Sequence, residues 1–348
     1  MSTASEQSGK APRRPIKLGI IGTGLASRNL HWPVLKEIPD LFQVTAVCNR
    51  GEEKAAEFAR LVGLSHYYLD HRQMLAEADV EAILVAVPIA LNYPITLDCA
   101  KAGKHVMCEK PVAVDLVQGR KMIHLPDQYG VVVQIAEQFY YREDLQRAKE
   151  LIESGELGEV FQVRMDVTVM IDPETGSGAT GWRIAPAHRG GFATDAGVHH
   201  MAQLRLLGGE VARVHAFTRR QSPHFGGVDN VCVNLLFRSG AIGHYSASYT
   251  ATSAEPWTAR TSVLGTKGTL EIGYGELWLQ PAGKRKRHHF RWQPFDGGYR
   301  NQWLAFYNAL VTGAPPAASP AQTYHDLELI LAALDAAERG EVISLPEE

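Results

Sequence analysis

The sequence has few cysteines and no long apolar run. Its 348 residues include four cysteines, and no two of them form a Cys-x-x-Cys pair; they are Cys48, Cys99, Cys108 and Cys232. Such sparse thiols exclude a disulfide framework for a chain of this length and indicate a reducing compartment. No window reaches the roughly 20 consecutive apolar residues of a membrane helix. We therefore expect a cytoplasmic protein with no membrane partner, which begins with a disordered tail over residues 1–15.

The sequence also lacks a large excess of charge of either sign. The chain carries 35 Lys and Arg against 38 Asp and Glu, so its formal net charge is only -3. This balance supplies no global field for nucleic acid or anionic lipid. The strongly basic run over residues 284–289 has aromatic and apolar neighbours, so we interpret it as part of a solvated hairpin. These features favour a small-molecule partner over nucleic acid.

The first third of the chain alternates short apolar runs with longer helical patterns, which is typical of βαβ units and a parallel sheet. Continuous apolar runs suit strands that helices cover on both faces. We predict such strands over residues 16–22, 43–48, 81–87, 104–108 and 131–135. Pro33 falls inside the helical pattern after the first strand and should kink or split that helix. The fold class is therefore α/β, with a first domain over residues 16–138.

The pattern changes after about residue 140. Residues 160–169 alternate strictly between apolar and polar, which predicts a half-solvated antiparallel strand. Turn signals separate further predicted strands over residues 231–237, 241–248, 261–264 and 268–272, and helical patterns follow near 302–311 and 324–338. We predict a second domain over residues 139–348, built on a mostly antiparallel sheet.

A glycine motif follows the first predicted strand. Residues 22–27 read Gly-Thr-Gly-Leu-Ala-Ser and match the dinucleotide fingerprint Gly-x-Gly-x-x-small. Gly22 would allow the tight turn, and Gly24 would let a pyrophosphate approach the backbone at the start of a helix that includes Leu25 and Ala26. Its place between a strand and a helix is the context that this motif requires. The alternative is a glycine turn without a ligand.

The end of the second predicted strand bears on the choice of cofactor. The fingerprint expects an acidic residue there to hold the ribose hydroxyls. This chain has Asn49 and Arg50 instead. Asn49 can bond a hydroxyl without repelling a phosphate, and Arg50 can pair with a 2'-phosphate, so NADP is favoured over NAD. In the alternative, Arg50 is a solvated loop residue, and the negative charges of Glu52 and Glu53 partly offset its positive charge.

Two further segments carry candidate chemistry. Glu109-Lys110-Pro111 lies at the carboxyl end of a predicted strand, where open parallel sheets bind ligands, and Lys110 could bond or deprotonate a substrate hydroxyl. Asp195 and His199 are four residues apart, so on a helix they would share a face and suit acid/base work. The alternatives are a solvated Lys110, a helix-capping Asp195 and a packed His199. We expect no metal site, because no third and fourth ligand recur at typical spacing around His188, His199 and His200.

Together these motifs resemble the Gfo/Idh/MocA oxidoreductase family, which includes glucose-fructose oxidoreductase and inositol dehydrogenase. The resemblance covers nearly the whole chain and rests on residues 19–24, 103–111 and 265–270 and on Asp195-x-Gly-x-His199. It implies an N-terminal Rossmann domain and a C-terminal α/β domain for substrate binding. That second domain would have a large open antiparallel sheet whose outer face makes homodimers or homotetramers.

The same resemblance implies roles for single residues. Lys110 would lie beside the nicotinamide and the reacting oxygen, His199 would be the acid/base, and Asp195 its neighbour at the substrate. Arg183 would bond the substrate, while Pro88, Asn92 and Glu109 would join the glycine loop in the cofactor site. The chain departs from the family pattern at Asn92, where relatives often carry His, and at Ala202, where many carry Asp.

These inferences predict an NAD(P)-dependent oxidoreductase that interconverts a secondary alcohol and a ketone on a sugar or cyclitol. His199 would accept the hydroxyl proton while Lys110 stabilises the developing alkoxide. Three other functions stay open. The chain could be a glycosidase that recycles its NAD in place, a nicotinamide-binding regulator without catalysis, or a structural subunit.

Overall fold

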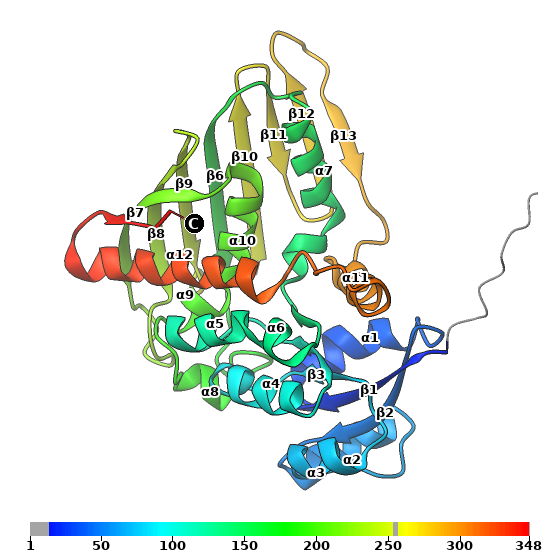
Figure 1. Ribbon diagram of the computed structural model, residues 1–348. Helices are drawn as coiled ribbons and strands as arrows, with labels where there is room; N and C mark the ends of the chain where they lie inside the picture. The colour runs from blue at the N-terminus through cyan, green and yellow to red at the C-terminus, as the bar shows by residue number, and fades with distance from the viewer. Residues whose placement is uncertain (1–13, 253–256, 348) are drawn as a thin grey trace, which may run out of the picture.

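The chain folds around two β-sheets, which the computed structural model places one above the other (Figure 1). The structure describes residues 14–252 and 257–347. The expected tail over residues 1–15 falls almost entirely on residues 1–13, which lie outside the described residues. No helix in the described part of the chain is long and apolar enough to cross a membrane.

The first sheet has five parallel strands in the order β2-β1-β3-β4-β5. The strands are β1 (Ile16–Ile21), β2 (Phe42–Cys48), β3 (Ala82–Val85), β4 (His105–Cys108) and β5 (Val133–Ile135). Every residue of β3 is buried, as expected of a strand that is covered on both faces. All five predicted strands are present, and their carboxyl ends lie along one edge of the sheet.

Helices connect these strands. They are η1 (Ser27–His31), α1 (Trp32–Leu35), α2 (Glu52–Leu61), α3 (His71–Glu77), η2 (Ile89–Leu91), α4 (Asn92–Lys101), α5 (Leu116–Ile123) and α6 (Leu125–Tyr129). The helix after β1 is divided as predicted, because the π-helical turn η1 ends at His31 and Pro33 lies in the first turn of α1. A proline ring has no N–H and would clash with a regular turn before it.

The second sheet has nine strands in the order β13-β12-β11-β10-β6-β9-β8-β7-β14. They are β6 (Val160–Val169), β7 (Val211–Arg219), β8 (Asn230–Phe237), β9 (Ile242–Ser248), β10 (Trp257–Gly265), β11 (Gly268–Ile272), β12 (Glu276–Pro281), β13 (His288–Arg291) and β14 (Ile343–Ser344). All neighbouring pairs are antiparallel except β6 with β9. The predicted fold class is confirmed, although the sequence patterns missed β7 and β14.

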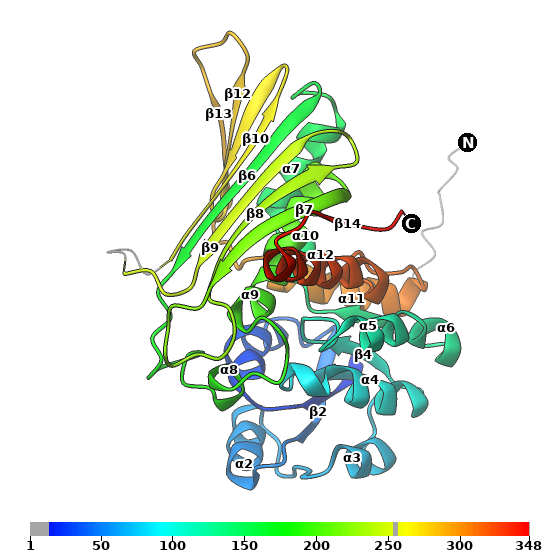
Figure 2. The same cartoon turned by 90° about the vertical axis from the view of Figure 1, so that its left-hand side faces the viewer.

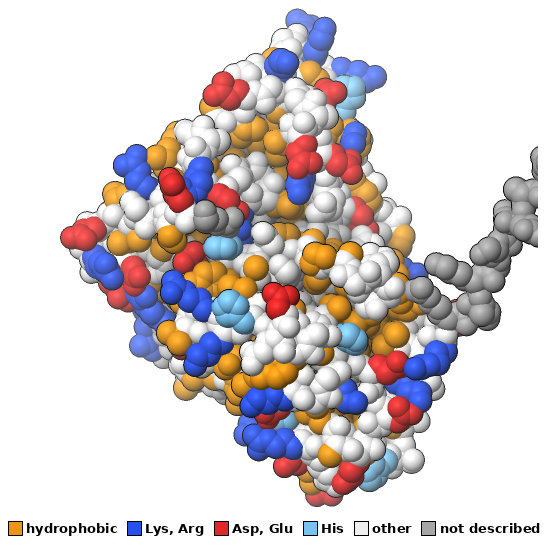
Figure 3. Space-filling view, viewed as in Figure 1, with side chains coloured by type: hydrophobic (Ala, Val, Ile, Leu, Met, Phe, Trp, Pro, Cys, Tyr) orange, Lys and Arg blue, Asp and Glu red, His pale blue; other side chains and the backbone are white. Residues whose placement is uncertain are grey.

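Strands β12 and β13 form the hairpin predicted around the basic run. Residues 284–289 at its tip are all exposed. In Figure 3, Lys and Arg side chains gather at this end of the molecule. The basic run is therefore a solvated tip, as expected.

Helices cover one face of the nine-stranded sheet. Figure 2 shows α7 (Glu143–Glu153), α10 (Gly197–Gly208) and α12 (Pro320–Arg339) on that face, and no described helix on the other. Helix α11 (Tyr299–Thr312) instead packs on the first sheet, where Trp303 lies 5.1 Å from Phe42 between ring centroids. The chain thus returns to its first sheet after building its second. The boundary near residue 138 stays a prediction.

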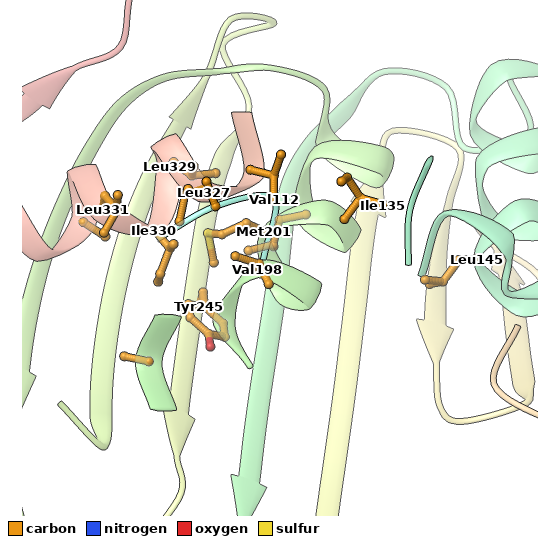
Figure 4. Close-up of a cluster of buried hydrophobic side chains, with 14 of the residues drawn as sticks. Val112, Ile135, Leu145, Val198, Met201, Tyr245, Leu327, Leu329, Ile330 and Leu331 are labelled. Carbon is orange, nitrogen blue, oxygen red and sulfur yellow. The ribbon is translucent and has the colours of Figure 1, made fainter. Parts of the chain in front are cut away.

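Helix α10 is held in a packed core between α12 and the large sheet (Figure 4). Val198 and Met201 of α10 point toward Leu327 and Ile330 of α12, and Tyr245 of β9 lies beneath them. All five side chains are buried. Because neighbouring residues of α10 point in other directions, this core also sets the orientation of the rest of the helix.

Leu327→Ala should lower the free energy of unfolding by about 2–5 kcal/mol, because it removes buried methyl groups and leaves a cavity. Urea denaturation followed by circular dichroism measures the change. The matched control is Val117→Ala on α5, whose side chain is 65% exposed and should change the midpoint little. Equal effects of the two substitutions would contradict this account of the core.

Candidate active site

The glycine loop connects β1 to the helix that begins at Leu25. Gly22 has φ 93°, and a Cβ there would lie 2.0 Å from the carbonyl oxygen of Ala86, so this position requires glycine. A Cβ at Gly24 would meet nothing within 4 Å, which leaves open space beside the loop. The first amide groups of a helix have no partner within it. The loop therefore fits a diphosphate, and Ser27 closes it by donating its hydroxyl to the Gly22 carbonyl at 2.5 Å.

Asn49 ties the end of β2 to this loop. Its Nδ2 donates to Thr23 Oγ1 at 2.8 Å, and its Oδ1 accepts from the amide of Gly51 at 2.9 Å. Arg50 is exposed and has no hydrogen bond or ion pair with any described residue. Helix α2 begins just beyond it without a side-chain cap. A free guanidinium and an uncapped helix N-terminus thus lie beside the glycine loop.

The side chain of Asn92 braces the Glu109-Lys110-Pro111 turn. It is fully buried, and its Nδ2 donates to the carbonyl oxygens of Glu109 at 2.7 Å and Pro111 at 2.8 Å. Pro88, also expected in the cofactor site, caps the short helix η2 that leads to Asn92. The amide at position 92 therefore holds the turn after β4 in place.

Lys110 lies between the two halves of the chain. Its Nζ donates to the Oδ1 of Asp195 at 2.8 Å and to the carbonyl oxygen of that residue at 2.7 Å. Asp195 ends α9 (Phe192–Asp195), and its Oδ2 accepts from Nε of Arg183 on α8 (Gly181–Ile184) at 2.7 Å. Burial alone would raise the pKa of Asp195, but the two cations outweigh it and hold that pKa well below its usual value.

The carboxylate on the His199 ring is Glu137, not Asp195 as the helical spacing suggested. Nδ1 of His199 lies 2.6 and 2.8 Å from the two carboxylate oxygens of Glu137, and the ring stacks on Phe139 at 4.9 Å. Asp195 makes no hydrogen bond to this ring, because Lys110 and Arg183 occupy it. Burial raises the pKa of Glu137 to about 8, although the charge of Lys110 acts in the opposite direction.

Sequence reasoning missed Glu137, and it also missed a second histidine–carboxylate pair. Nε2 of His31 lies 2.8 Å from Oε1 of Glu109, and the His31 side chain is fully buried. Burial alone would raise the pKa of Glu109, but the hydrogen bond and charge of His31 lower it, helped by Lys110. One signal was available for Glu137, since it follows β5 at the same edge of the sheet as Lys110.

A cavity of about 310 Å³ lies against Lys110 and His199. Lys110, Arg183, Asp195 and His199 all line it, as do apolar side chains from the inner face of the large sheet. Nε2 of His199 has no partner among the described residues and is not among the buried unpaired atoms. The cavity is of the size that small ligands occupy, and it combines an apolar floor with a few convergent polar groups.

His200 adds a polar corner to the same cavity. Its Nδ1 lies 2.7 Å from Oη of Tyr245, which lies 3.3 Å from Oη of Tyr249. Burial lowers the pKa of His200 to about 3, so this ring is neutral near pH 7. The corner is therefore a set of neutral hydrogen-bonding groups. Across the described residues, no group of His, Cys, Asp or Glu is arranged to hold a metal.

Comparison with known proteins settles the family. Residues 16–137 match the family described as oxidoreductases with an NAD-binding Rossmann fold, and residues 145–271 match the GFO/IDH/MocA C-terminal domain. The chain belongs to the Gfo/Idh/MocA family. It is thus an oxidoreductase with an NAD-binding Rossmann domain, as the sequence motifs predicted.

Named relatives and a solved structure agree with this assignment. An oxidoreductase from Thermotoga maritima has a crystal structure that is similar with a TM-score of 0.88 and 33% identity, over 95% of this chain and 98% of that one. The 1,5-anhydro-D-fructose reductase of Ensifer adhaerens is 26% identical over 94% of this chain and 98% of its own length. The myo-inositol 2-dehydrogenase of Thermotoga maritima is 25% identical, covering 87% and 91% respectively.

Gly24→Val tests the cofactor site of this oxidoreductase. The open space around Gly24 should accept the new side chain without loss of fold, but that side chain would fill the approach of a diphosphate. We expect the dissociation constant for NAD(P)H to rise about 10-fold or more, as measured by nicotinamide fluorescence. The thermal unfolding midpoint controls for folding. Unchanged affinity in the folded variant would remove Gly24 from the cofactor site.

Proposed function

We propose that this oxidoreductase interconverts a secondary alcohol and a ketone on a sugar or cyclitol-like substrate. The observation that carries the proposal is one cavity lined by both Lys110 and His199, at the carboxyl edge of the dinucleotide-binding sheet. The names of the reductase and dehydrogenase relatives support an alcohol or ketone as the reacting group. A polar cavity with an apolar floor suits a small ring that carries hydroxyls.

In this mechanism Lys110 and His199 share the work on the reacting oxygen. The nicotinamide, when bound, accepts or supplies the hydride. Lys110 has three N–H donors and uses two contacts on Asp195, so one donor can reach the substrate oxygen and stabilise an alkoxide. Nε2 of His199 would accept the hydroxyl proton in oxidation and return it in reduction. Asp195 would hold Lys110 in position, and Arg183 would bond a further substrate oxygen.

The cofactor would lie along the carboxyl edge of the first sheet. The residues proposed to hold it are Gly22, Gly24, Leu25, Ala26, Asn49, Arg50, Pro88, Asn92, Glu109 and Lys110. NADP is favoured over NAD, because no carboxylate occupies position 49 and Arg50 has no partner in the described chain. The uncapped N-terminus of α2 adds donors for a 2'-phosphate, although Glu52 and Glu53 in its first turn reduce the local field.

We also propose a homodimer or homotetramer that forms through the open face of the nine-stranded sheet, and a cytoplasmic location. The face without described helices in Figure 2 supports the first proposal. The second is supported by the four cysteines, all of which are free thiols.

Lys110→Ala should lower kcat by about 100-fold or more, because it removes the donor to the reacting oxygen. Affinity for NADPH should change only a few-fold, since other residues make most of the proposed cofactor contacts. Steady-state kinetics with a panel of polyols and ketoses measures the first effect, and fluorescence titration the second. Lys101→Ala, on the exposed side of α4, is the matched control. Full turnover in the Lys110 variant would end the proposal.

Arg50→Ala should weaken NADPH about 10-fold or more while NADH affinity stays nearly constant, because a charge-assisted contact to the 2'-phosphate is lost. Parallel titrations with the two cofactors give the ratio. The control is Arg60→Ala, which also removes one positive charge, but at the far end of α2 and away from the proposed phosphate site. It measures the effect of changing the net charge alone. A similar loss for both cofactors would contradict the proposed NADP preference.

A further inference from the structure

Glu137 occupies a position that the mechanism above does not use. It precedes η3 (Gln138–Tyr141), and its carboxylate accepts from the amide of Phe139 at 3.3 Å. Glu137 as a whole is only 1% exposed. Both carboxylate oxygens lie within 2.8 Å of Nδ1 of His199. The carboxylate is therefore held by an amide of the turn that follows it and is directed at the His199 ring.

No described Lys or Arg lies in ion-pair contact with this carboxylate. Lys110 is paired with Asp195 at 2.8 Å, and Arg142 is paired with Asp144 through two contacts of 3.0 and 2.6 Å. A buried carboxylate that lacks a cation is costly as an anion. This arrangement therefore favours a proton on the pair of Glu137 and His199.

Burial favours the uncharged form of each member of the pair. Burial raises the pKa of Glu137 to about 8 and lowers that of His199 well below its usual value, and the charge of Lys110 lowers both. The net shift of each pKa favours the neutral form of its group, although the charge of Lys110 opposes that form at Glu137. The titratable groups that face the pair come from several elements; they are Glu109, Lys110, Tyr140, Arg142, Asp195, His200, Tyr299 and Asp326.

The state of the pair determines what His199 offers to the cavity. While the pair retains its proton, Nδ1 and the carboxylate share one hydrogen, and Nε2 carries another, so Nε2 is a donor. When the pair has lost that proton, the hydrogen on the ring stays between Nδ1 and Glu137, and Nε2 becomes an acceptor. The same nitrogen is thus an acid in one state and a base in the other.

We propose that Glu137 and His199 titrate as a single unit, and that its protonation state sets the direction in which the enzyme works well. The protonated unit donates to a carbonyl oxygen and favours reduction, and the deprotonated unit accepts a hydroxyl proton and favours oxidation. Glu137 acts through His199 and is a positioning residue. The assignment of direction rests on the proposed function.

The proton and the hydride balance in each direction. In oxidation the substrate O–H bond breaks and its proton forms the N–H bond at Nε2, while the proton on Nδ1 moves toward the Glu137 carboxylate. The carbon that bears this oxygen loses a hydride, which a bound nicotinamide would accept, and a C=O bond forms. Reduction runs these steps in reverse, with the proton returning from Nε2 to the alkoxide oxygen.

The pH profile of kcat tests the inference through Glu137→Gln, which keeps the volume but removes the carboxylate. In the wild type, oxidation should rise and reduction should fall through a midpoint near pH 8. In the variant, His199 titrates alone with its depressed pKa, so both midpoints should move to lower pH by about one unit or more. Glu137→Asp keeps a carboxylate and should restore most of the wild-type profile.

Asp326→Asn is the matched control. Asp326 is a second buried carboxylate that reaches α10, but it does so through Arg205 at 2.6 Å rather than through His199. Its substitution should move the midpoint of the pH profile far less than Glu137→Gln does, because Asp326 makes no hydrogen bond to the pair and interacts with Glu137 only at a distance. A shift in Asp326→Asn as large as that in Glu137→Gln, or an unshifted profile in Glu137→Gln, would overturn the inference.

A measurement without turnover separates this inference from the proposed function. ¹⁵N spectra of labelled histidines in the cofactor-free protein report both ring nitrogens, and His199→Gln identifies the signals. We expect the His199 signals to change near pH 8 in the wild type and at clearly lower pH in Glu137→Gln. Identical titrations in the two proteins would overturn the coupled unit. Failure of every substrate, with the expected titration present, would count against the proposed function alone.

Discussion

The ion pair between Lys110 and Asp195 is the contact on which the arrangement of the site depends. Lys110 follows β4 of the parallel sheet, and Asp195 ends α9 in the second half of the chain. A cation buried at this junction needs a carboxylate within hydrogen-bond distance, and the carboxylate in turn binds Arg183. The bridge therefore aligns the edge of the dinucleotide-binding sheet with the cavity on the large sheet. The contact between Glu137 and His199 is a second link between the same two halves of the chain.

Charge balance distinguishes the members of this site. Lys110 and Arg183 share the buried carboxylate of Asp195, and Arg142 pairs with the buried carboxylate of Asp144, so ion pairing offsets part of the cost of burying these cations. Glu137 has a histidine instead, which can exist without charge. The site thus combines an ion-paired bridge with a pair that can gain or lose a proton. In the proposed reaction both would be used, because a positive charge would stabilise the alkoxide and a basic nitrogen would accept the hydroxyl proton.

Packing far from the chemistry supports this geometry. Val198 and Met201 face the core against α12, and His199 between them points toward Glu137. Because side chains leave a helix at fixed angles, the core contacts of α10 set the direction in which the His199 side chain points. In the N-terminal half of the chain, Asn92 stabilises the site in a similar way, since its buried side-chain amide holds the turn that carries Lys110.

The sequence by itself determined the features that depend on local pattern. Continuous apolar runs identified the five parallel strands, Gly22 and Gly24 identified the loop after β1, and Pro33 marked the division of the following helix. Motif likeness identified the family and drew attention to Lys110 and His199. Only the tertiary structure decided the partners of these residues, because Lys110 meets Asp195 across 85 positions and His199 meets Glu137 across 62. Periodicity reports which face of an element is buried, but it carries no information about which distant side chain lies opposite, and that pairing sets the charges and proton affinities of the site.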